Sequence, residues 1–404
     1  MLKRSDNYKV WVRDDSVVEQ ALLANQSADA ELTAYGENDS VLDYLMTSGL
    51  WSILTGMESD GLQAGNGYSS AILNGVEVIR ELASIGRIQQ CGKVLADTRL
   101  MMQAGFNLAR IARATEGKRS VIDPETLANH LNRISPESAQ RTFMAYVREM
   151  RQRRLIRGQV YAADAHEITI PYGRSHERIG RVGEKYGFKL VMLINVLEDR
   201  ERIVGFAFAP LPTSERTMLL EILKRLDQEV APLREWLQIL LLDRGYWGAK
   251  YLLGLHEQYQ IDVVTRARHE GVDTHGQVRG TWAKKTENRR IHPRASTGNP
   301  AAGLEVVDYI ETSLAEASWQ EQLEEHSRFG TIKVRSAGVK DVPLYDEKGK
   351  VLGKVNAVVA DEFDTAGKRL KGEDGNERPR FYYVTTMPLP NGYLASGDYI
   401  VGGG

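Results

Sequence analysis

The sequence predicts a mixed α/β protein in which an all-helical N-terminal domain precedes a mixed sheet core with a β-rich insertion. Three observations predict this class: helical spacing of apolar residues up to about residue 157, strand-like runs that alternate with helices from residue 158, and short strands with turns from about residue 270. The 404 residues exceed one ordinary domain, and 42% hydrophobic with 26% charged residues is typical of globular proteins.

The N-terminal part begins with a polar segment, residues 1–40, followed by a helical domain over residues 41–157. The stretches VLDYLMTSGLWSILTGM and SSAILNGVEVIRELASIGRI carry apolar residues at helical spacing. In DPETLANHLNRI, Asp123 is a predicted cap, Pro124 takes the first helical position and Glu125 lies in the first turn. A last helix is predicted from Ala139 to Arg157.

The next part, residues 158–269, alternates strands and helices. GQVYAADAHEITIP, GFKLVMLINVLE and RIVGFAFAPL read as strands, and the charged turn EDRER predicts a hairpin between the second and third. The helix TSERTMLLEILKRLDQEV follows, with Thr213 or Ser214 as its cap, and then the strand WLQILLLD, the helix GYWGAKYLLGLHEQ and the strand QIDVVTRAR. This order matches the core of RNase-H-like proteins, an analogy of fold that alone says little about function.

The remaining chain divides into an insertion and a return to the core. Residues 270–380 break into short strands, turns and charged stretches, with a hairpin expected around EKGK. The aromatic and β-branched run RFYYVTTMPL predicts that the last core strand begins near Phe381, so residues 381–404 hold that strand and the C-terminal end.

Composition limits the possible surroundings and partners of the protein. The formal net charge of -2 means that affinity for nucleic acid depends on local basic patches. The single cysteine, Cys91, excludes an internal disulfide and a cysteine-rich zinc site, which fits a cytoplasmic location. No apolar run approaches the length of a membrane span, and the first residues lack the apolar segment of a secretion signal, so we expect no membrane association.

Two aspartates lie in or at the end of predicted strands, where aspartate is uncommon. Asp164 lies in the middle of the small and apolar stretch VYAADAHEI, and Asp243 ends the apolar run LQILLLD. On neighbouring strands the two carboxylates would repel each other unless a cation lay between them, and oxygen ligands suit Mg²⁺ or Mn²⁺. The alternative is that Asp164 is an ordinary strand residue and that Asp243 caps the following helix.

These residues resemble the DDE transposases of the IS4-like group, whose RNase-H-like core carries a β-rich insertion. The resemblance rests on YAADAHEI around Asp164, LLLDRGYWGAKYL around Asp243 and the strand FYYVTTMPL, and it covers about Val41 to Val401. It implies that Asp164 and Asp243 are catalytic metal ligands in hydrolysis of a phosphodiester and attack of the freed 3′-hydroxyl on target DNA. Two metal ions can activate the attacking oxygen and stabilise the leaving oxygen.

One feature of that group is missing from the sequence. Its third catalytic carboxylate is a glutamate on a helix after the strand matched by FYYVTTMPL, and no glutamate follows Phe381. We therefore expect a chain truncated before that glutamate, able to bind DNA with little or no cleavage. The glutamates inside the insertion, Glu311, Glu316, Glu321 and Glu362, have no motif support as substitutes.

Two basic clusters are candidates for contacts with DNA phosphates. The first lies in RGTWAKKTENRRIHPR and includes Trp282, whose aromatic ring could stack on a base. Its basic residues are Lys284, Lys285, Arg289, Arg290 and Arg294. The second is the arginine-rich end of the helix near Arg157, namely Arg148, Arg151, Arg153, Arg154 and Arg157. Long arginine side chains also cover helix faces, so packing is an equal alternative for the second cluster.

The resulting hypothesis is a DNA transposase that binds transposon ends and target DNA and needs Mg²⁺ or Mn²⁺. The sequence leaves open whether it forms a homo-oligomer. A first alternative is a catalytically inactive DNA-binding remnant or inhibitor of transposition. A second is a metal-dependent nuclease without a role in transposition, whose third carboxylate lies elsewhere in the chain.

Overall fold

The computed structural model describes residues 20, 23–25, 35, 38–59, 68–106, 111, 120–171, 179–196, 201–267, 300–345, 350–372, 375, 377–378 and 380–389. The chain divides into two compact units, Met1–Tyr146 and Val147–Gly404, and the division falls within a helix. Both helices and a mixed sheet are present, so the predicted α/β class is confirmed at that level. Within the described part of the chain, no helix is long and apolar enough to cross a membrane.

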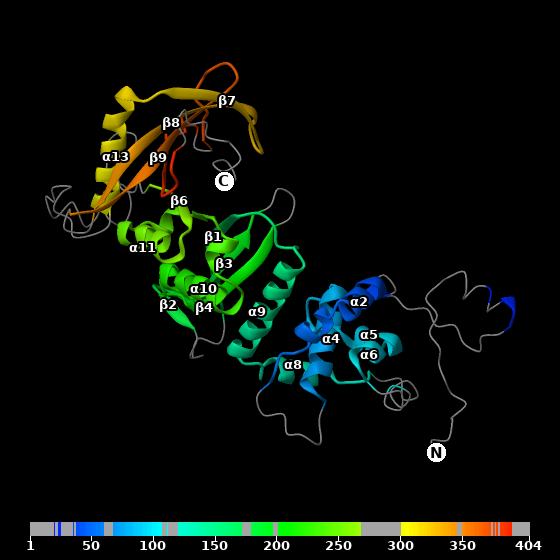
Figure 1. Ribbon diagram of the computed structural model, residues 1–404. Helices are drawn as coiled ribbons and strands as arrows, with labels where there is room; N and C mark the ends of the chain where they lie inside the picture. Colours follow the sequence, from blue (N-terminus) through cyan, green and yellow to red (C-terminus); the bar gives the residue numbers. More distant parts are fainter. Residues whose placement is uncertain are drawn as a thin grey trace. The chain divides into compact units, whose positions relative to one another are not determined.

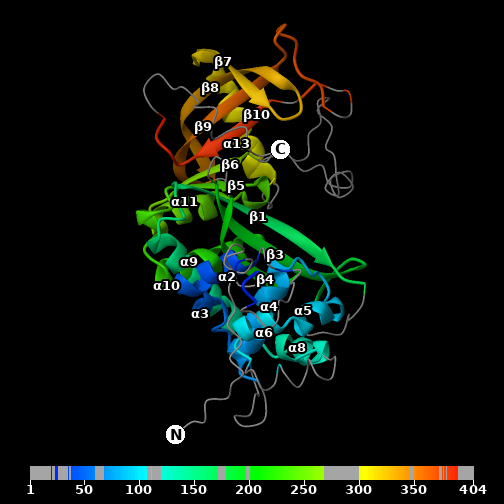
Figure 2. The ribbon, with the colours of Figure 1, turned by 90° about the vertical axis from the view of Figure 1, so that its right-hand side faces the viewer.

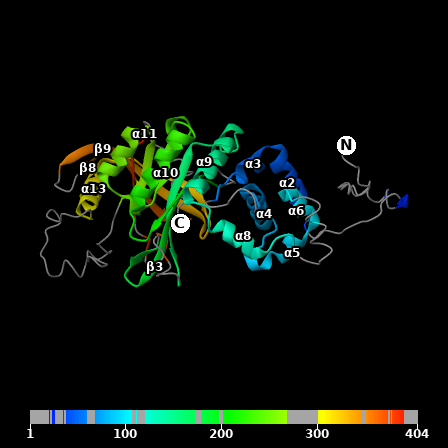
Figure 3. The same ribbon diagram turned by 90° about the horizontal axis from the view of Figure 1, so that it is seen from below.

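The first unit is built from short helices, which lie together around α4 (Figure 3). The helices are α2 (Asn38–Thr47), α3 (Leu50–Leu54), α4 (Ser70–Leu82), α5 (Gly92–Ala96), α6 (Thr98–Ala104), α8 (Pro124–Leu131) and the first part of α9 (Pro136–Gln152), with a 3-10 turn at Ile88–Gln90.

Apolar spacing and caps explain the local structure of these helices. Leu73, Val76 and Ile79 recur on one face of α4 and are buried in the core of the unit. The predicted helix over 41–57 is divided in two at Gly49, whose φ of 78° lies in the left-handed region. The predicted cap at Asp123 is confirmed, since its side chain accepts a hydrogen bond of 2.8 Å from the Glu125 N–H.

Helix α9 differs from its predicted bounds at both ends. It begins at Pro136 and ends at Gln152, instead of running from Ala139 to Arg157. Proline is favoured in the first turn of a helix, which accounts for the earlier start. The early end coincides with Arg154, whose φ of 57° is left-handed and cannot continue a right-handed helix.

The second unit is organised around a single ten-stranded sheet. Its strands are β1 (Val160–Thr169), β2 (Gly180–Val182), β3 (Lys185–Asn195), β4 (Arg202–Pro210), β5 (Ile239–Leu242), β6 (Asp262–Arg266), β7 (Trp319–His326), β8 (Gly330–Tyr345), β9 (Val351–Phe363) and β10 (Phe381–Thr385). Along the sheet their order is β2-β3-β1-β5-β6-β10-β9-β8-β7, and β4 pairs with β3. Figure 2 shows β5, β6 and β10 following one another between β1 and β9.

The directions of the strands divide this sheet into two parts. Strands β1, β5 and β6 are parallel neighbours, while β3 is antiparallel to both β1 and β4. The predicted β3–β4 and β8–β9 hairpins are both confirmed by antiparallel pairing. Strand β10 is antiparallel to β6 on one side and to β9 on the other, so the strands of the insertion extend the core sheet.

Helices connect these strands and cover the sheet. α10 (Glu215–Glu229) follows β4, and α11 (Ala249–Tyr259) joins β5 to β6. Gly205 of β4 allows α10 to approach closely, because a Cβ atom at this position would lie 2.3 Å from the Ile222 Cγ2 atom. Since Gly205 pairs with Leu193, and Leu193 pairs with Ala163, α10 covers the sheet face to which these residues belong.

The described residues of the insertion include a helix that the sequence pattern did not predict. α13 (Pro300–Ser313) runs alongside β8 and β9 (Figure 1). Its Val306, Val307 and Ile310 are buried at helical spacing. The turn and charge signals of residues 270–380 had indicated only short strands and turns, and β8, with 16 residues, is also longer than that description.

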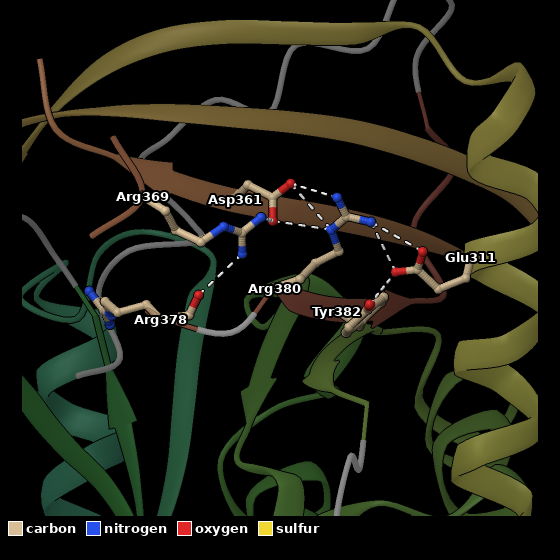
Figure 4. A network of polar contacts seen from close by, with 6 residues as sticks. All are labelled: Glu311, Asp361, Arg369, Arg378, Arg380 and Tyr382. Carbon is tan, nitrogen blue, oxygen red and sulfur yellow. Dashed lines mark hydrogen bonds and ion pairs between the residues drawn. The ribbon is translucent and has the colours of Figure 1, made fainter. Parts of the chain in front are cut away.

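A network of ion pairs links α13, β9 and β10 (Figure 4). Asp361 of β9 is 1% exposed and accepts hydrogen bonds from Arg369 at 2.7 Å and from Arg380 at 2.9 Å. Arg380 also donates to Glu311 of α13 at 3.0 Å, and the Tyr382 hydroxyl bonds to the same carboxylate. The network therefore fixes α13 to the strand that returns to the core.

Candidate active site

The two predicted aspartates are brought to adjacent positions of the sheet. β1 and β5 are parallel neighbours, as expected, and their last recorded pair is Ala163 with Leu242. One step further along the same register, Asp164 lies opposite Asp243. Both side chains are exposed, whereas Ala163 and Leu242 are buried. Since successive side chains point to opposite faces of a sheet, both aspartates belong to the face opposite α10, which we call the Asp face.

Each carboxylate already makes one local hydrogen bond. Asp164 Oδ1 accepts from the Ala165 N–H at 2.8 Å, and Asp243 Oδ1 accepts from the Arg244 N–H at 2.7 Å. Asp243 is also the N-cap of the 3-10 turn Arg244–Tyr246, so its reading as a cap is confirmed for that turn. The cap of α11 is Gly248. In both aspartates the second oxygen is not used by these local bonds, so a cap role and a ligand role are compatible.

The loop after Asp243 is held against the sheet by buried aromatic rings. Tyr246 and Trp247 are each 1% exposed, so both rings are packed in the interior. Burial raises the pKa of the Tyr246 hydroxyl well above its ordinary value, and the negative charges of Glu215, Asp164 and Asp243 add to the rise. This hydroxyl therefore stays protonated, and it lies within electrostatic range of three carboxylates.

Glu215 is a nearby carboxylate that the sequence reading did not single out. It is the first residue of α10, and its Oε1 accepts from the Lys189 ammonium at 3.1 Å. Its Oε2 lies next to Gly245, where a Cβ atom would approach to 3.0 Å. No sequence signal separates Glu215 from an ordinary acidic residue in the first turn of a helix.

The predicted metal site offers two carboxylates as ligands. Across the described ranges, no three His, Cys, Asp or Glu side chains form a group able to hold a metal ion. Asp164 and Asp243 form a pair of hard oxygen donors, and Mg²⁺ in proteins is commonly held by one or two carboxylates while it keeps several waters. The type of these donors is therefore compatible with Mg²⁺ or Mn²⁺, and the metal itself stays a prediction.

The glutamates of the insertion have structural partners. Glu311 bonds to Arg380 and Tyr382, and Glu362 lies 2.6 Å from Arg378. Burial raises the pKa of Glu362, and Arg378 opposes that rise. Glu321 lies 3.7 Å from Lys333. The side chain of Glu316 is outside the described part of the structure.

The two basic clusters have different outcomes. The first, with Trp282, Lys284, Lys285, Arg289, Arg290 and Arg294, lies entirely outside the described residues. In the second, Arg148 donates to the Glu229 carbonyl and Arg153 to Glu149. Arg151 lies 3.3 Å from Glu235 and over the Trp236 ring. Each of these three arginines therefore has a partner within the protein, and contact of this cluster with DNA stays a prediction.

Comparisons with known proteins do not identify the chain. No family model matches the sequence, and no curated protein or solved structure is significantly similar to it.

Proposed function

We propose that the protein is a DNA-processing enzyme of the DDE transposase type, with Asp164 and Asp243 as its catalytic carboxylates. The observation that carries the proposal is the register of β1 and β5, which ends with Ala163 opposite Leu242. Continued by one residue, this register brings the two aspartates side by side on one sheet face. The strand order β4-β3-β1-β5-β6, with β1, β5 and β6 parallel, supports an RNase-H-like core, as does the position of α10 and α11 between strands.

The two aspartates have a clear role in this proposal. Their carboxylates would hold Mg²⁺ or Mn²⁺, which supplies an activated oxygen nucleophile and stabilises the leaving oxygen of a phosphodiester. Without a cation, two adjacent carboxylates repel each other, and a pair of this kind is costly unless a positive group is shared. The site is open to a large substrate because both side chains are exposed.

A second candidate is a DNA-binding protein that does not cleave. It is favoured by the observation that no third ligand joins the two aspartates among the residues the structure describes. In this case the aspartates are expected to affect neither DNA affinity nor stability strongly. Cleavage separates the two candidates.

The experiment combines a cleavage assay with a binding assay. Supercoiled plasmid DNA is incubated with the protein and Mg²⁺ or Mn²⁺, and nicked and linear products are measured, while binding to a labelled duplex is followed by gel shift. Asp164→Asn and Asp243→Asn keep the size of the side chain and remove the charge, and Glu321→Gln on β7 is the matched control. Metal-dependent cleavage that both site variants abolish, and the control retains, supports the enzyme.

Other outcomes discriminate as sharply. DNA binding without cleavage favours the second candidate. Cleavage that survives both substitutions contradicts the assignment of the two aspartates. Joining of a labelled 3′-hydroxyl end to the plasmid separates a transposase from a nuclease that only hydrolyses DNA.

A further inference from the structure

Arg266 occupies a position next to the aspartate pair. It is the last residue of β6, and the register of β5 and β6 ends with the pair Leu242–Thr265. One step further, Arg266 lies beside Asp243. Thr265 is buried while Arg266 is partly exposed, so Arg266 belongs to the Asp face. Neighbouring strands are about 5 Å apart, which places its Cα atom about one strand from Asp243 and two from Asp164.

The guanidinium group of Arg266 is held by an aromatic ring. Its central carbon lies 4.4 Å from the centroid of Phe381, a residue of β10 that is only 7% exposed. A buried ring is a fixed support, and stacking uses the flat face of the guanidinium while its N–H groups remain at the edge. The arrangement orients the donors of Arg266 before any ligand arrives.

Arg266 makes no direct ion pair in the described part of the chain, although its charge and that of Arg378 both act on Glu362 and oppose the rise of the Glu362 pKa. Among the described residues, no carboxylate lies within ion-pair distance of its guanidinium. Arg378 provides the contrast, because it also stacks on Phe381, at 5.3 Å, but lies 2.6 Å from Glu362. Of the two arginines at this ring, Arg378 is in direct contact with Glu362, while Arg266, the one nearer to Asp243, interacts with Glu362 only from beyond ion-pair distance.

We infer that Arg266 binds a backbone phosphate of the DNA strand on which Asp164 and Asp243 act. This inference rests on the proposed function and adds a positioning residue to it. Arginine binds phosphate through two parallel N–H bonds, and a preoriented guanidinium loses little freedom when it does so. A strand fixed in this way presents the neighbouring phosphodiester to the two carboxylates, which repel DNA when no cation is bound.

The structure offers a matched control on the other side of the sheet. Arg335 of β8 stacks on Trp319 at 4.5 Å, and no carboxylate within the described ranges forms an ion pair with it. Arg335 pairs with Asp361, whereas Arg266 pairs with Tyr383 and Tyr383 with Val358. Residues 358 and 361 are three apart on β9, so the two arginines lie on opposite faces.

The experiment measures binding of a fluorescently labelled DNA duplex by anisotropy, without divalent metal, over a range of salt concentrations. Arg266→Ala is expected to weaken binding about tenfold. Its plot of log affinity against log salt is expected to be shallower by about one unit, the contribution of one phosphate contact. Arg266→Lys keeps the charge and retains part of the affinity, and Arg335→Ala binds like the unaltered protein. Circular dichroism verifies that each variant is folded.

Each result has one meaning. A shallower salt slope for Arg266→Ala, together with an unaffected Arg335→Ala, supports the inference. Equal affinities and slopes for the two alanine variants overturn it and leave the proposed function intact. If the unaltered protein does not bind DNA at all, the proposed function fails and this inference fails with it.

Discussion

Replacing Asp361 with Ala is expected to lower the free energy of unfolding of the second unit by about 3 kcal/mol. Asp361 is 1% exposed and accepts hydrogen bonds from Arg369 at 2.7 Å and from Arg380 at 3.1 and 2.9 Å. Removing one partner of a buried ion pair typically costs about 3–5 kcal/mol. The lower end applies here because Arg369 and Arg380 keep 24% and 28% of their side-chain surface in water, and Arg380 keeps Glu311.

Denaturation by urea measures this loss. Tryptophan fluorescence is a suitable signal because Arg380 stacks on Trp319 at 5.3 Å, and far-UV circular dichroism provides an independent one. The control is Glu321→Ala on β7, which removes an exposed carboxylate 3.7 Å from Lys333 and is expected to cost less than about 0.5 kcal/mol. If Asp361→Ala is no less stable than this control, the network does not fix the insertion and the reasoning is wrong.

Three further predictions concern single positions. Gly205→Ala places a methyl group against Ile222 of α10 and should destabilise the second unit by about 1–3 kcal/mol in thermal unfolding, whereas a wild-type transition would mean that α10 does not pack closely there. Burial lowers the pKa of His130, and Glu77 opposes this with a smaller effect. As the pH falls, this imidazole therefore takes up a proton more readily in the unfolded chain than in the folded one. The free energy of unfolding of the first unit should therefore fall as the pH drops below about 6.5, and His130→Gln should remove this dependence in urea titrations at pH 7.5 and 5.5. Tyr246→Phe removes a buried hydroxyl that has no hydrogen-bond partner among the described residues. It should leave stability unchanged or raise it by about 1 kcal/mol, and a clear loss in the same titration would reveal a bond to that hydroxyl.

The core strands were predictable because their patterns are local. Alternation and apolar runs predicted β1, β3, β4, β5, β6 and β10 within a few residues, and the helix start at Asp123 followed from cap chemistry. Adjacency of Asp164 and Asp243 was predictable only through the order of strands and helices. The one-residue match of their register is a property of the folded sheet that no local pattern reveals.

The parts that the sequence reading missed depend on contacts between distant segments. α13 has apolar residues at helical spacing, but its glycine and the charged, turn-rich segments around it masked the pattern. Strand β10 pairs with β6, which lies more than 100 residues earlier in the chain, and with β9, which lies about 20 residues earlier. Arg266 was missed for the same reason, since its position beside Asp243 and its support by Phe381 both arise from pairing across the sheet.

The return of the chain on β10 has a consequence for protein engineering. The polypeptide leaves the core at the end of β6 and re-enters on the strand directly beside it, so the insertion begins and ends at one place in the sheet. A peptide tag or a small reporter domain placed between β8 and β9 would lengthen the insertion without displacing β6 or β10, the strands at its two ends. The spacing between β1 and β5, and with it the two aspartates, should be unaffected by such a graft.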